Sequence, residues 1–131
     1  MESLYYEETL ETPGIEFDAE KGLLKMYGKS FPEEAGKFYE PILNWLDEYS
    51  ENPREKTQVI IFMEYFNSAS STRILEILYT LNNIYRNNHS VSIEWHYLDE
   101  DDDMRESGEE YDEMIQIPMK LIPEQEIEIK N

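Results

Sequence analysis

The chain is organised around Val59-Ile60-Ile61-Phe62-Met63-Glu64-Tyr65-Phe66-Asn67-Ser68-Ala69-Ser70-Ser71-Thr72-Arg73, where the strongest strand pattern meets the strongest helix pattern. Its first part is apolar and rich in β-branched residues, which is typical of a central strand covered on both faces. Alternation places Tyr65 on the face of Met63, and Phe66 on the face of Phe62. Beyond the joint, apolar residues recur at helical spacing: Ile74, Leu75, Leu78, Leu81 and Tyr85. The stretch therefore predicts a strand, a tight joint and a helix.

Hydroxyl residues crowd this joint: Ser68, Ser70, Ser71 and Thr72, preceded by Asn67. One side-chain oxygen is enough to cap the unpaired amides at a helix start, and Ser68 lies near that N-cap position. The same amides, with the positive end of the helix dipole, also suit a phosphoryl group. The residues alone leave two hypotheses open, a plain helix cap or a phosphoacceptor at Ser68.

The remaining segments predict a single α/β domain over residues 1–131, with helices packed on one mixed β-sheet. The first residues suit an edge strand or an arm, and residues 1–11 and 124–131 are candidates for flexible ends. The expected order is ββαβαβαβ: strands at 15–17 and 24–26, a helix from 30–33 to 50–53, a strand over 57–66, a helix over 69–87, a strand over 91–97, a short helix near 104–115 and a strand over 117–122. Ser30 is expected to cap the first helix, with Glu33 completing a capping box. The strand–helix–strand units imply right-handed crossovers and a partly parallel sheet.

The net charge of the chain limits the classes of partner that it can bind. Thirty acidic residues against eleven basic ones give a net charge of −19. Such a surface repels phosphate backbones and anionic lipids, so we expect neither nucleic-acid nor membrane partners, and it favours a partner with a basic face. The absence of cysteine excludes disulfides and thiolate metal sites. Without a membrane-length apolar run or a signal peptide, a cytoplasmic protein is expected.

No catalytic set, cofactor motif or metal motif is predicted. A small serine hydrolase using Ser68 with His96 is the enzymatic alternative, but the Gly-x-Ser-x-Gly elbow is absent around Ser68. The acidic run Asp99–Glu110 has the carboxylate spacing of a calcium loop, yet Met104 stands where the loop needs glycine. An acid-rich helix start explains this run better. A third alternative is an acidic scaffold or inhibitor that binds a basic partner without modification.

Short motifs lie in a fixed order along almost the whole chain. They are Thr12-Pro13, Phe17-Asp18, Gly22, Met26-x-Gly28-x-Ser30-Phe31-Pro32-Glu33, Phe38-Tyr39-x-Pro41-Ile42-x-x-Trp45-Leu46, Tyr65-Phe66-Asn67-Ser68-Ala69-Ser70-Ser71, Trp95-His96-Tyr97 and Gly108-Glu109-Glu110-Tyr111. Together they resemble the SiaC-type regulatory phosphoproteins. The resemblance implies a fold similar to bacterial anti-sigma factor antagonists (STAS-like domains), a mixed sheet with helices packed on it.

The resemblance also implies partner switching without enzymatic activity. It implies a cognate serine/threonine kinase, an opposing metal-dependent PP2C-type phosphatase, and an effector such as a diguanylate cyclase, hence cyclic-di-GMP signalling and biofilm regulation. The family motif reads Asn-Thr-Ser-Ser with threonine as the acceptor, whereas here Ser68 follows Asn67 and Ala69 replaces the next serine. The resemblance therefore assigns Ser68 as the acceptor, with Ser70 and Ser71 as fallback acceptors. Asn67, Ser70 and Ser71 are expected to contact the partners.

Overall fold

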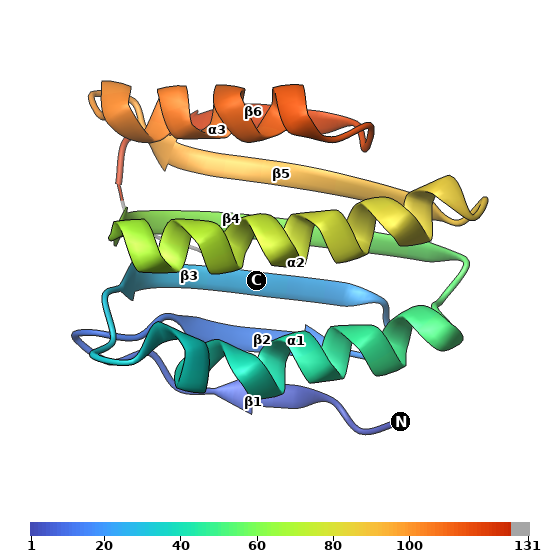
Figure 1. Ribbon diagram of the computed structural model, residues 1–131. Helices are drawn as coiled ribbons and strands as arrows, with labels where there is room; N and C mark the ends of the chain where they lie inside the picture. Colours follow the sequence, from blue (N-terminus) through green and yellow to red (C-terminus); the bar gives the residue numbers. More distant parts are fainter. Residues whose placement is uncertain (127–131) are drawn as a thin grey trace.

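Six strands and three helices make up residues 1–126, the part of the chain that the computed structural model describes (Figure 1). In chain order they are β1 (Leu4–Tyr6), β2 (Gly14–Asp18), β3 (Leu23–Ser30), α1 (Ala35–Glu51), β4 (Lys56–Phe66), α2 (Ser68–Arg86), β5 (Ser90–Leu98), α3 (Asp102–Met114) and β6 (Met119–Glu124). The predicted α/β class with a mixed sheet is confirmed. The structure adds β1, an edge strand, where the sequence left a strand or an arm open. Most of the predicted C-terminal flexible end, residues 127–131, lies outside the described residues.

The strands form one sheet in the order β1-β2-β3-β4-β5-β6. The first three strands pair antiparallel, and β3 to β6 pair parallel. Each strand–helix–strand crossover therefore advances to the next strand in the same direction. Crossovers of the usual right hand that all advance one way place their helices on the same face, and α1, α2 and α3 all lie in front of the sheet in Figure 1. Within residues 1–126 helices thus cover one face of the central strand, while Phe62 on the other face is nevertheless 1% exposed and lies against His96.

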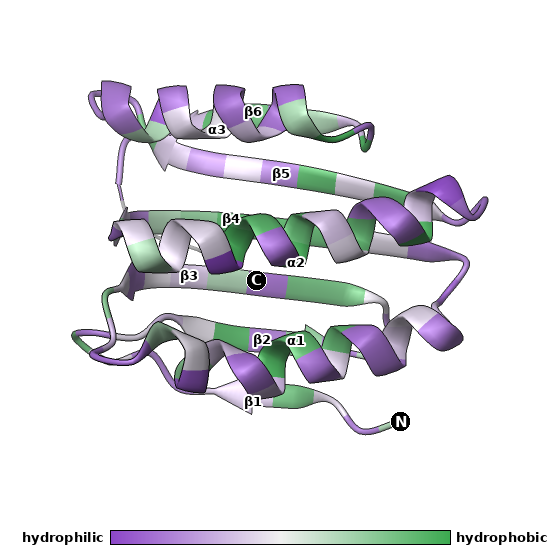
Figure 2. Ribbon diagram, viewed as in Figure 1, coloured by the Kyte–Doolittle hydropathy of each residue, from purple (hydrophilic) through white to green (hydrophobic). Residues whose placement is uncertain are grey.

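The core lies between the sheet and the three helices. Trp95 of β5 and Tyr39 of α1 are fully buried there, with Ile42 and Leu46 from the predicted apolar face of α1. Figure 2 shows hydrophobic stretches in the middle strands and hydrophilic residues along the outward sides of α1 and α3. Within residues 1–126 no helix combines the length and the apolar character needed to cross a bilayer.

The first helix begins later than the sequence predicted. Ser30, the expected cap, is the last residue of β3 and pairs with β4. The helix starts at Ala35, and its N-cap residue Glu34 makes no side-chain capping bond. Ser30 cannot serve as the cap because its hydroxyl is fully buried and bonded to Tyr39 and Ser70. The predicted capping box is therefore wrong.

Helix α3 meets the sheet through a glycine. A Cβ atom added at the buried Gly108 would lie 2.5 Å from Trp95 Cδ1 and 2.7 Å from Leu121 Cδ2. The Trp95 indole also donates a 3.0 Å hydrogen bond to the Met104 carbonyl in the same helix. The missing side chain at Gly108 therefore sets how closely α3 approaches β5.

Replacing Gly108 with alanine should destabilise the fold, although alanine is favoured over glycine inside a helix by about 1 kcal/mol. Overpacking against buried side chains costs about 1–3 kcal/mol, so we expect a net loss of about 1 kcal/mol. Urea denaturation measures it. Glu106→Ala, at an exposed position of the same helix, is the control and should change the free energy of unfolding by less than about 0.5 kcal/mol. A Gly108→Ala chain more stable than wild type would contradict the packing.

Candidate functional site

The joint after β4 lies at the edge of the sheet where β3, β4 and β5 end, on the left in Figure 1. Asn67, between β4 and α2, is the N-cap residue: its backbone is extended, and its Oδ1 accepts a 2.9 Å hydrogen bond from the Ser70 amide. Ser68, expected near the N-cap position, directly follows the N-cap residue. Ser68 is the first residue of α2, so its hydroxyl is not needed for capping.

The hydroxyl residues of the joint differ in exposure. Ser70 is fully buried, Ser71 is half-buried, and Ser68 and Thr72 are exposed. Ser71 Oγ donates to the Ser68 carbonyl at 2.8 Å, and Thr72 Oγ1 donates to the same carbonyl at 3.4 Å, as serine and threonine commonly do inside helices. No hydrogen bond within residues 1–126 engages Ser68 Oγ. Of the three residues expected to contact partners, Asn67 and Ser71 are half-buried and Ser70 is inaccessible.

Two tyrosines hold the joint from opposite sides. On the α1 side, Tyr39 Oη lies 2.6 Å from Ser30 Oγ, and Ser30 Oγ donates to Ser70 Oγ at 2.8 Å. Because the Ser30 proton is directed to Ser70, Tyr39 is the donor in the first contact. On the α3 side, Tyr111 Oη donates to the Ser71 carbonyl at 2.8 Å.

Both phenols are held in the protonated form by their surroundings. Burial raises the pKa of Tyr39 above its usual value, and the nearby hydroxyl side chains of Ser30 and Ser70 only partly oppose the rise. Burial also raises the pKa of Tyr111, the nearby Tyr39 adds to the rise, and the hydroxyl side chain of Ser71 opposes it. At neutral pH both side chains therefore act as hydrogen-bond donors.

A β-bulge in β4 decides which side chains flank the joint. The register between β3 and β4 shifts after Gly28: Lys29 lies opposite Tyr65, which leaves Glu64 as an extra residue. An extra residue exchanges the two faces of the strand beyond it. The predicted faces of Tyr65 and Phe66 are therefore both wrong, since Phe66 turns toward the helices and Tyr65 turns away from them.

The new direction of Phe66 ties the joint to the core. Its ring centroid lies 6.4 Å from that of Trp95 and 6.4 Å from that of Tyr111. Trp95 and Tyr111 also meet edge-on, with centroids 5.5 Å apart. Three aromatic rings thus connect the end of β4 with β5 and α3 directly before Ser68.

Tyr65 forms an exposed aromatic pair with Phe31 beside the joint. Their ring centroids are 5.9 Å apart in an edge-on arrangement, and the residues are 51% and 37% exposed. Leu10, 82% exposed, lies in the neighbouring β1–β2 loop, whose Glu11 carbonyl accepts a 2.8 Å hydrogen bond from the Phe31 amide. We call Leu10, Phe31 and Tyr65 the edge patch. Acidic residues lie within three positions of its members in the chain: Glu7, Glu8, Glu11, Glu33, Glu34 and Glu64.

A groove of about 370 Å³ lies beside Ser68, between α2 and α3. It is lined by Phe66, Asn67, Ser68, Ser71, Thr72, Leu75, Ser107, Glu110, Tyr111 and Met114. Among these described lining residues, Glu110 is the one that carries a charge at neutral pH. A phosphoryl group on Ser68 would therefore meet hydroxyls and a carboxylate in this groove, without a cation to neutralise it.

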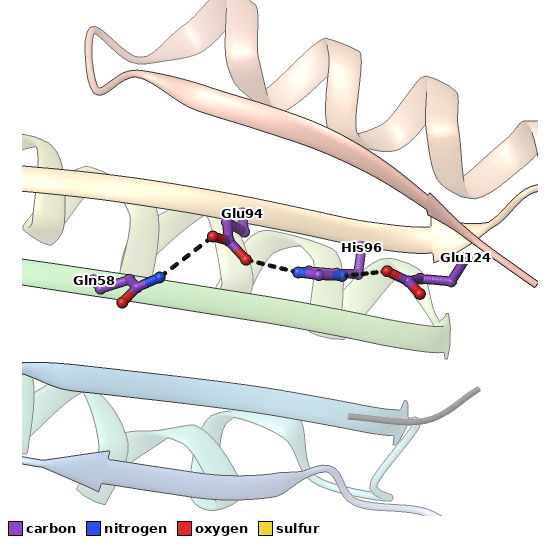
Figure 3. A network of polar contacts seen from close by, with 4 residues as sticks. All are labelled: Gln58, Glu94, His96 and Glu124. Atoms are coloured by element: carbon purple, nitrogen blue, oxygen red, sulfur yellow. Dashed lines mark hydrogen bonds and ion pairs between the residues drawn. The ribbon is translucent and has the colours of Figure 1, made fainter. Parts of the chain in front are cut away.

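His96, the base in the serine hydrolase alternative, points to the face of the sheet without helices, because its neighbours in β5 are buried in the core. Figure 3 shows it between two carboxylates: Nε2 lies 2.9 Å from Glu94 and Nδ1 lies 3.1 Å from Glu124. Glu94 also accepts a 3.3 Å hydrogen bond from the Gln58 amide. Since α2 packs on the opposite face, the structure does not bring Ser68 and His96 together.

The acidic run before α3 starts that helix. Asp101 is the N-cap, and its Oδ1 accepts a 3.0 Å hydrogen bond from the Met104 amide. Arg105 forms exposed ion pairs with Asp102 at 3.6 Å and with Glu109 at 3.7 Å. No group of three or more carboxylates or histidines suited to a metal ion occurs in residues 1–126. The structure thus favours the helix-start interpretation over a calcium loop.

Comparison with known proteins identifies one family. The model described as SiaC family regulatory phosphoprotein matches residues 6–124. An uncharacterized protein of Pseudomonas aeruginosa (strain UCBPP-PA14) is 26% identical over 121 residues, which cover 92% of this chain and 96% of that protein.

Solved structures of SiaC are also similar to this chain. The crystal structure of apo-SiaC from Pseudomonas aeruginosa has a TM-score of 0.85 and 25% identity, over 93% of this chain and 99% of that one. A crystal structure of the diguanylate cyclase SiaD in complex with its activator SiaC, from the same organism, matches with a TM-score of 0.87 and 25% identity, over 92% of this chain and 99% of the matched chain.

Sequence reasoning missed the residues that brace the joint, Ser30, Tyr39 and Tyr111. Both tyrosines lie on apolar helix faces and look like ordinary core residues. The available signal was the phenol itself, since a buried hydroxyl needs a hydrogen-bond partner. The partner could not be named, because Ser30 and Ser70 are forty positions apart and meet only in the folded sheet.

Replacing Asn67 with alanine should lower the free energy of unfolding by about 0.5–2 kcal/mol, because it removes the side chain that caps α2. Ser68→Ala is the matched control, and we expect a change within about 0.5 kcal/mol because the first helical residue needs no side-chain acceptor. Circular dichroism during urea denaturation measures both. A larger loss for Ser68→Ala than for Asn67→Ala would refute the assignment of the N-cap.

Proposed function

Because the chain belongs to the SiaC family of regulatory phosphoproteins, we propose that it is a signalling switch phosphorylated on Ser68. In this proposal a cognate serine/threonine kinase adds the phosphate, a PP2C-type phosphatase removes it, and both act in the cytoplasm. The unmodified protein binds and regulates an effector. The observation that carries the proposal is the exposed hydroxyl of Ser68, which makes no hydrogen bond within residues 1–126, at a helix start capped by Asn67.

The choice of Ser68 over its neighbours rests on access and hydrogen bonding. A kinase must reach the acceptor oxygen and remove its proton. Ser70 is fully buried in the hydroxyl chain with Ser30, and Ser71 is half-buried with its proton directed to the Ser68 carbonyl. Thr72 is exposed but makes a weaker contact of the same kind. Ser68 alone among the four combines exposure with an unengaged oxygen in the described residues.

The start of α2 also suits the product of phosphorylation electrostatically. The first turn of α3 carries Asp102 and Asp103, whereas the first turn of α2 carries no acidic side chain. The positive end of the α2 dipole is therefore not complemented by a nearby carboxylate in that turn. A phosphate of about −1.5 to −2 charge on Ser68 would be favoured there, so the modified state is compatible with a folded helix.

The effector we propose is a diguanylate cyclase, and thus an output in cyclic-di-GMP and biofilm regulation. The supporting observation is that the related SiaC is the activator of the cyclase SiaD and forms a complex with it. In this chain the edge patch supplies exposed aromatic and aliphatic side chains, and its Tyr65 precedes Ser68 by three residues. Such clusters surrounded by charged residues are typical of protein interfaces.

Phosphate on Ser68 would oppose such docking for a local reason. A phosphoserine buried in an interface must lose its water, and Glu110 in the adjoining groove offers repulsion where a cation would be needed. The modified protein therefore releases its effector. Of the alternatives, the hydrolase would need His96 beside Ser68, but His96 lies on the other face of the sheet, and the unmodified scaffold gives no role to the exposed Ser68 hydroxyl.

Mass-spectrometric mapping of the protein isolated from its own cells should find phosphate on Ser68. Ser68→Ala should abolish the phosphorylated form, and Ser71→Ala should retain it, because Ser71 is not the acceptor. Phosphate confined to Ser71, Thr72 or residues outside the joint would reject the assignment.

Calorimetric titration against a diguanylate cyclase of the same organism tests the effect on binding. We expect phosphoserine at Ser68 to weaken binding at least about tenfold, which corresponds to about 1.4 kcal/mol. Tyr65→Ser should weaken it similarly through loss of the edge patch. The control is Tyr79→Ser, because Tyr79 is 45% exposed but eleven residues, or about 16 Å, further along α2. Equal affinity of the modified and unmodified proteins would disprove the switch.

A further inference from the structure

The side of the joint nearest α1 is fixed by a chain of three hydroxyls. Tyr39, Ser30 and Ser70 are each fully buried, and their oxygens are 2.6 Å and 2.8 Å apart in succession. Neither the cap of α2 nor the proposed phosphorylation uses these groups directly. Buried hydroxyls have no water to replace a lost partner, so moving Ser70 would leave polar groups unsatisfied. The chain therefore resists displacement of the first turn of α2.

The other side of the joint is fixed by α3. Tyr111 is 7% exposed, and its hydroxyl donates to the Ser71 carbonyl at 2.8 Å. Its ring also lies near that of Phe66, two residues before Ser68. The backbone that precedes Ser68 and the backbone that follows it are thus both held by neighbouring elements, while Ser68 itself is exposed.

We propose that Tyr39 and Tyr111 are positioning residues of the phosphoacceptor turn, residues 67–71. They fix the backbone on both sides of Ser68, so that a phosphoryl group there changes the molecular surface and leaves the turn in place. The inference rests on the proposed phosphorylation of Ser68 and specifies how partner proteins recognise the modification. Partners then distinguish the two states by the phosphate itself and not by a rearranged helix.

The chemistry of the turn supports a modification without rearrangement. Ser68 Oγ makes no hydrogen bond within the described residues, so esterifying it breaks none. The added charge meets the positive end of the α2 dipole, which favours the helical turn. The Glu110 carboxylate in the groove between α2 and α3 repels the phosphate from the groove and directs it toward solvent.

Amide hydrogen exchange on the full chain tests the positioning role. Tyr39→Phe and Tyr111→Phe each remove one hydroxyl and keep the ring. We expect exchange of the Ser70 and Ser71 amides to become roughly 3- to 10-fold faster, the effect of one neutral hydrogen bond on local opening. Tyr85→Phe, a partly buried tyrosine near the C-terminal end of α2, is the matched control and should leave these amides unchanged. Wild-type exchange in both test variants would overturn the role.

The same measurement on a chain with phosphoserine incorporated at position 68 during translation tests the fixed turn. Exchange of the Ser70 and Ser71 amides should stay within about threefold of the unmodified protein. Exchange tenfold faster or more would show that phosphorylation opens the turn and would overturn the proposal. Because the phosphate is installed without a kinase, this result does not depend on whether Ser68 is phosphorylated in the cell. If the turn behaves as expected while cellular phosphate maps elsewhere, only the assignment of Ser68 as the cellular acceptor fails.

Kinetics with the kinase that modifies the protein separate positioning from simple stability. Tyr111→Phe and Ser30→Ala, which breaks the hydroxyl chain at its middle, should lower kcat for phosphorylation about 3- to 10-fold with KM little changed, since the docking surface is intact and the acceptor is less well held. Tyr85→Phe should match wild type. Unchanged kcat for both variants would contradict the proposal.

Discussion

The extra residue in β4 is the constraint on which the candidate site depends. It is accommodated opposite Gly28, whose φ of +103° lies in the region that glycine adopts readily. Without the bulge, Tyr65 would face the helices and Phe66 would face away from them. Phe66 would then lose its contacts with Trp95 and Tyr111, and α3 would keep only its hydrogen bond to the joint. A register shift of one residue therefore turns Phe66 into the core and leaves Tyr65 exposed, immediately before Ser68.

The direction of the sheet explains why the site forms where it does. Strand order runs one way from β1 to β6, so the three helices share a face and all begin at the edge where their preceding strands end. Helix starts carry unpaired amides and partial positive charge, and in parallel sheets this edge is where ligands and partners commonly bind. The loops leading to α1 and α2 place Phe31 and Ser68 at that edge. The opposite face holds the network around His96, which explains why the only histidine in a strand takes no part in the site.

The sequence predicted the elements of this fold well and their details at the joint poorly, and the difference has a physical cause. Periodicity is local, so the strand over 57–66 and the helix that follows could be placed within a residue or two. The roles of Ser30 and Tyr65 depend on partners far along the chain. Ser30 was predicted as a cap because Pro32 and Glu33 follow it, but pairing with β4 keeps it in a strand. Strict alternation along the strand predicts that Tyr65 shares the face of Met63, and nothing in the sequence pattern indicates a bulge at Glu64.

Net charge alone cannot make such a switch work. The chain already carries −19, and a phosphate of about −1.5 to −2 changes that total by roughly a tenth. At physiological ionic strength, screening also limits the range of an exposed charge to about 8 Å. The phosphate therefore has little electrostatic effect on distant acidic residues. The effect must therefore arise where water is removed, among side chains in contact with Ser68. The groove containing Glu110, which Ser68 helps to line, is such a place, and a turn held by two tyrosines keeps the phosphate at its rim. The switch thus requires both an anchored backbone, which holds the phosphate in place, and local electrostatics, through which its charge acts.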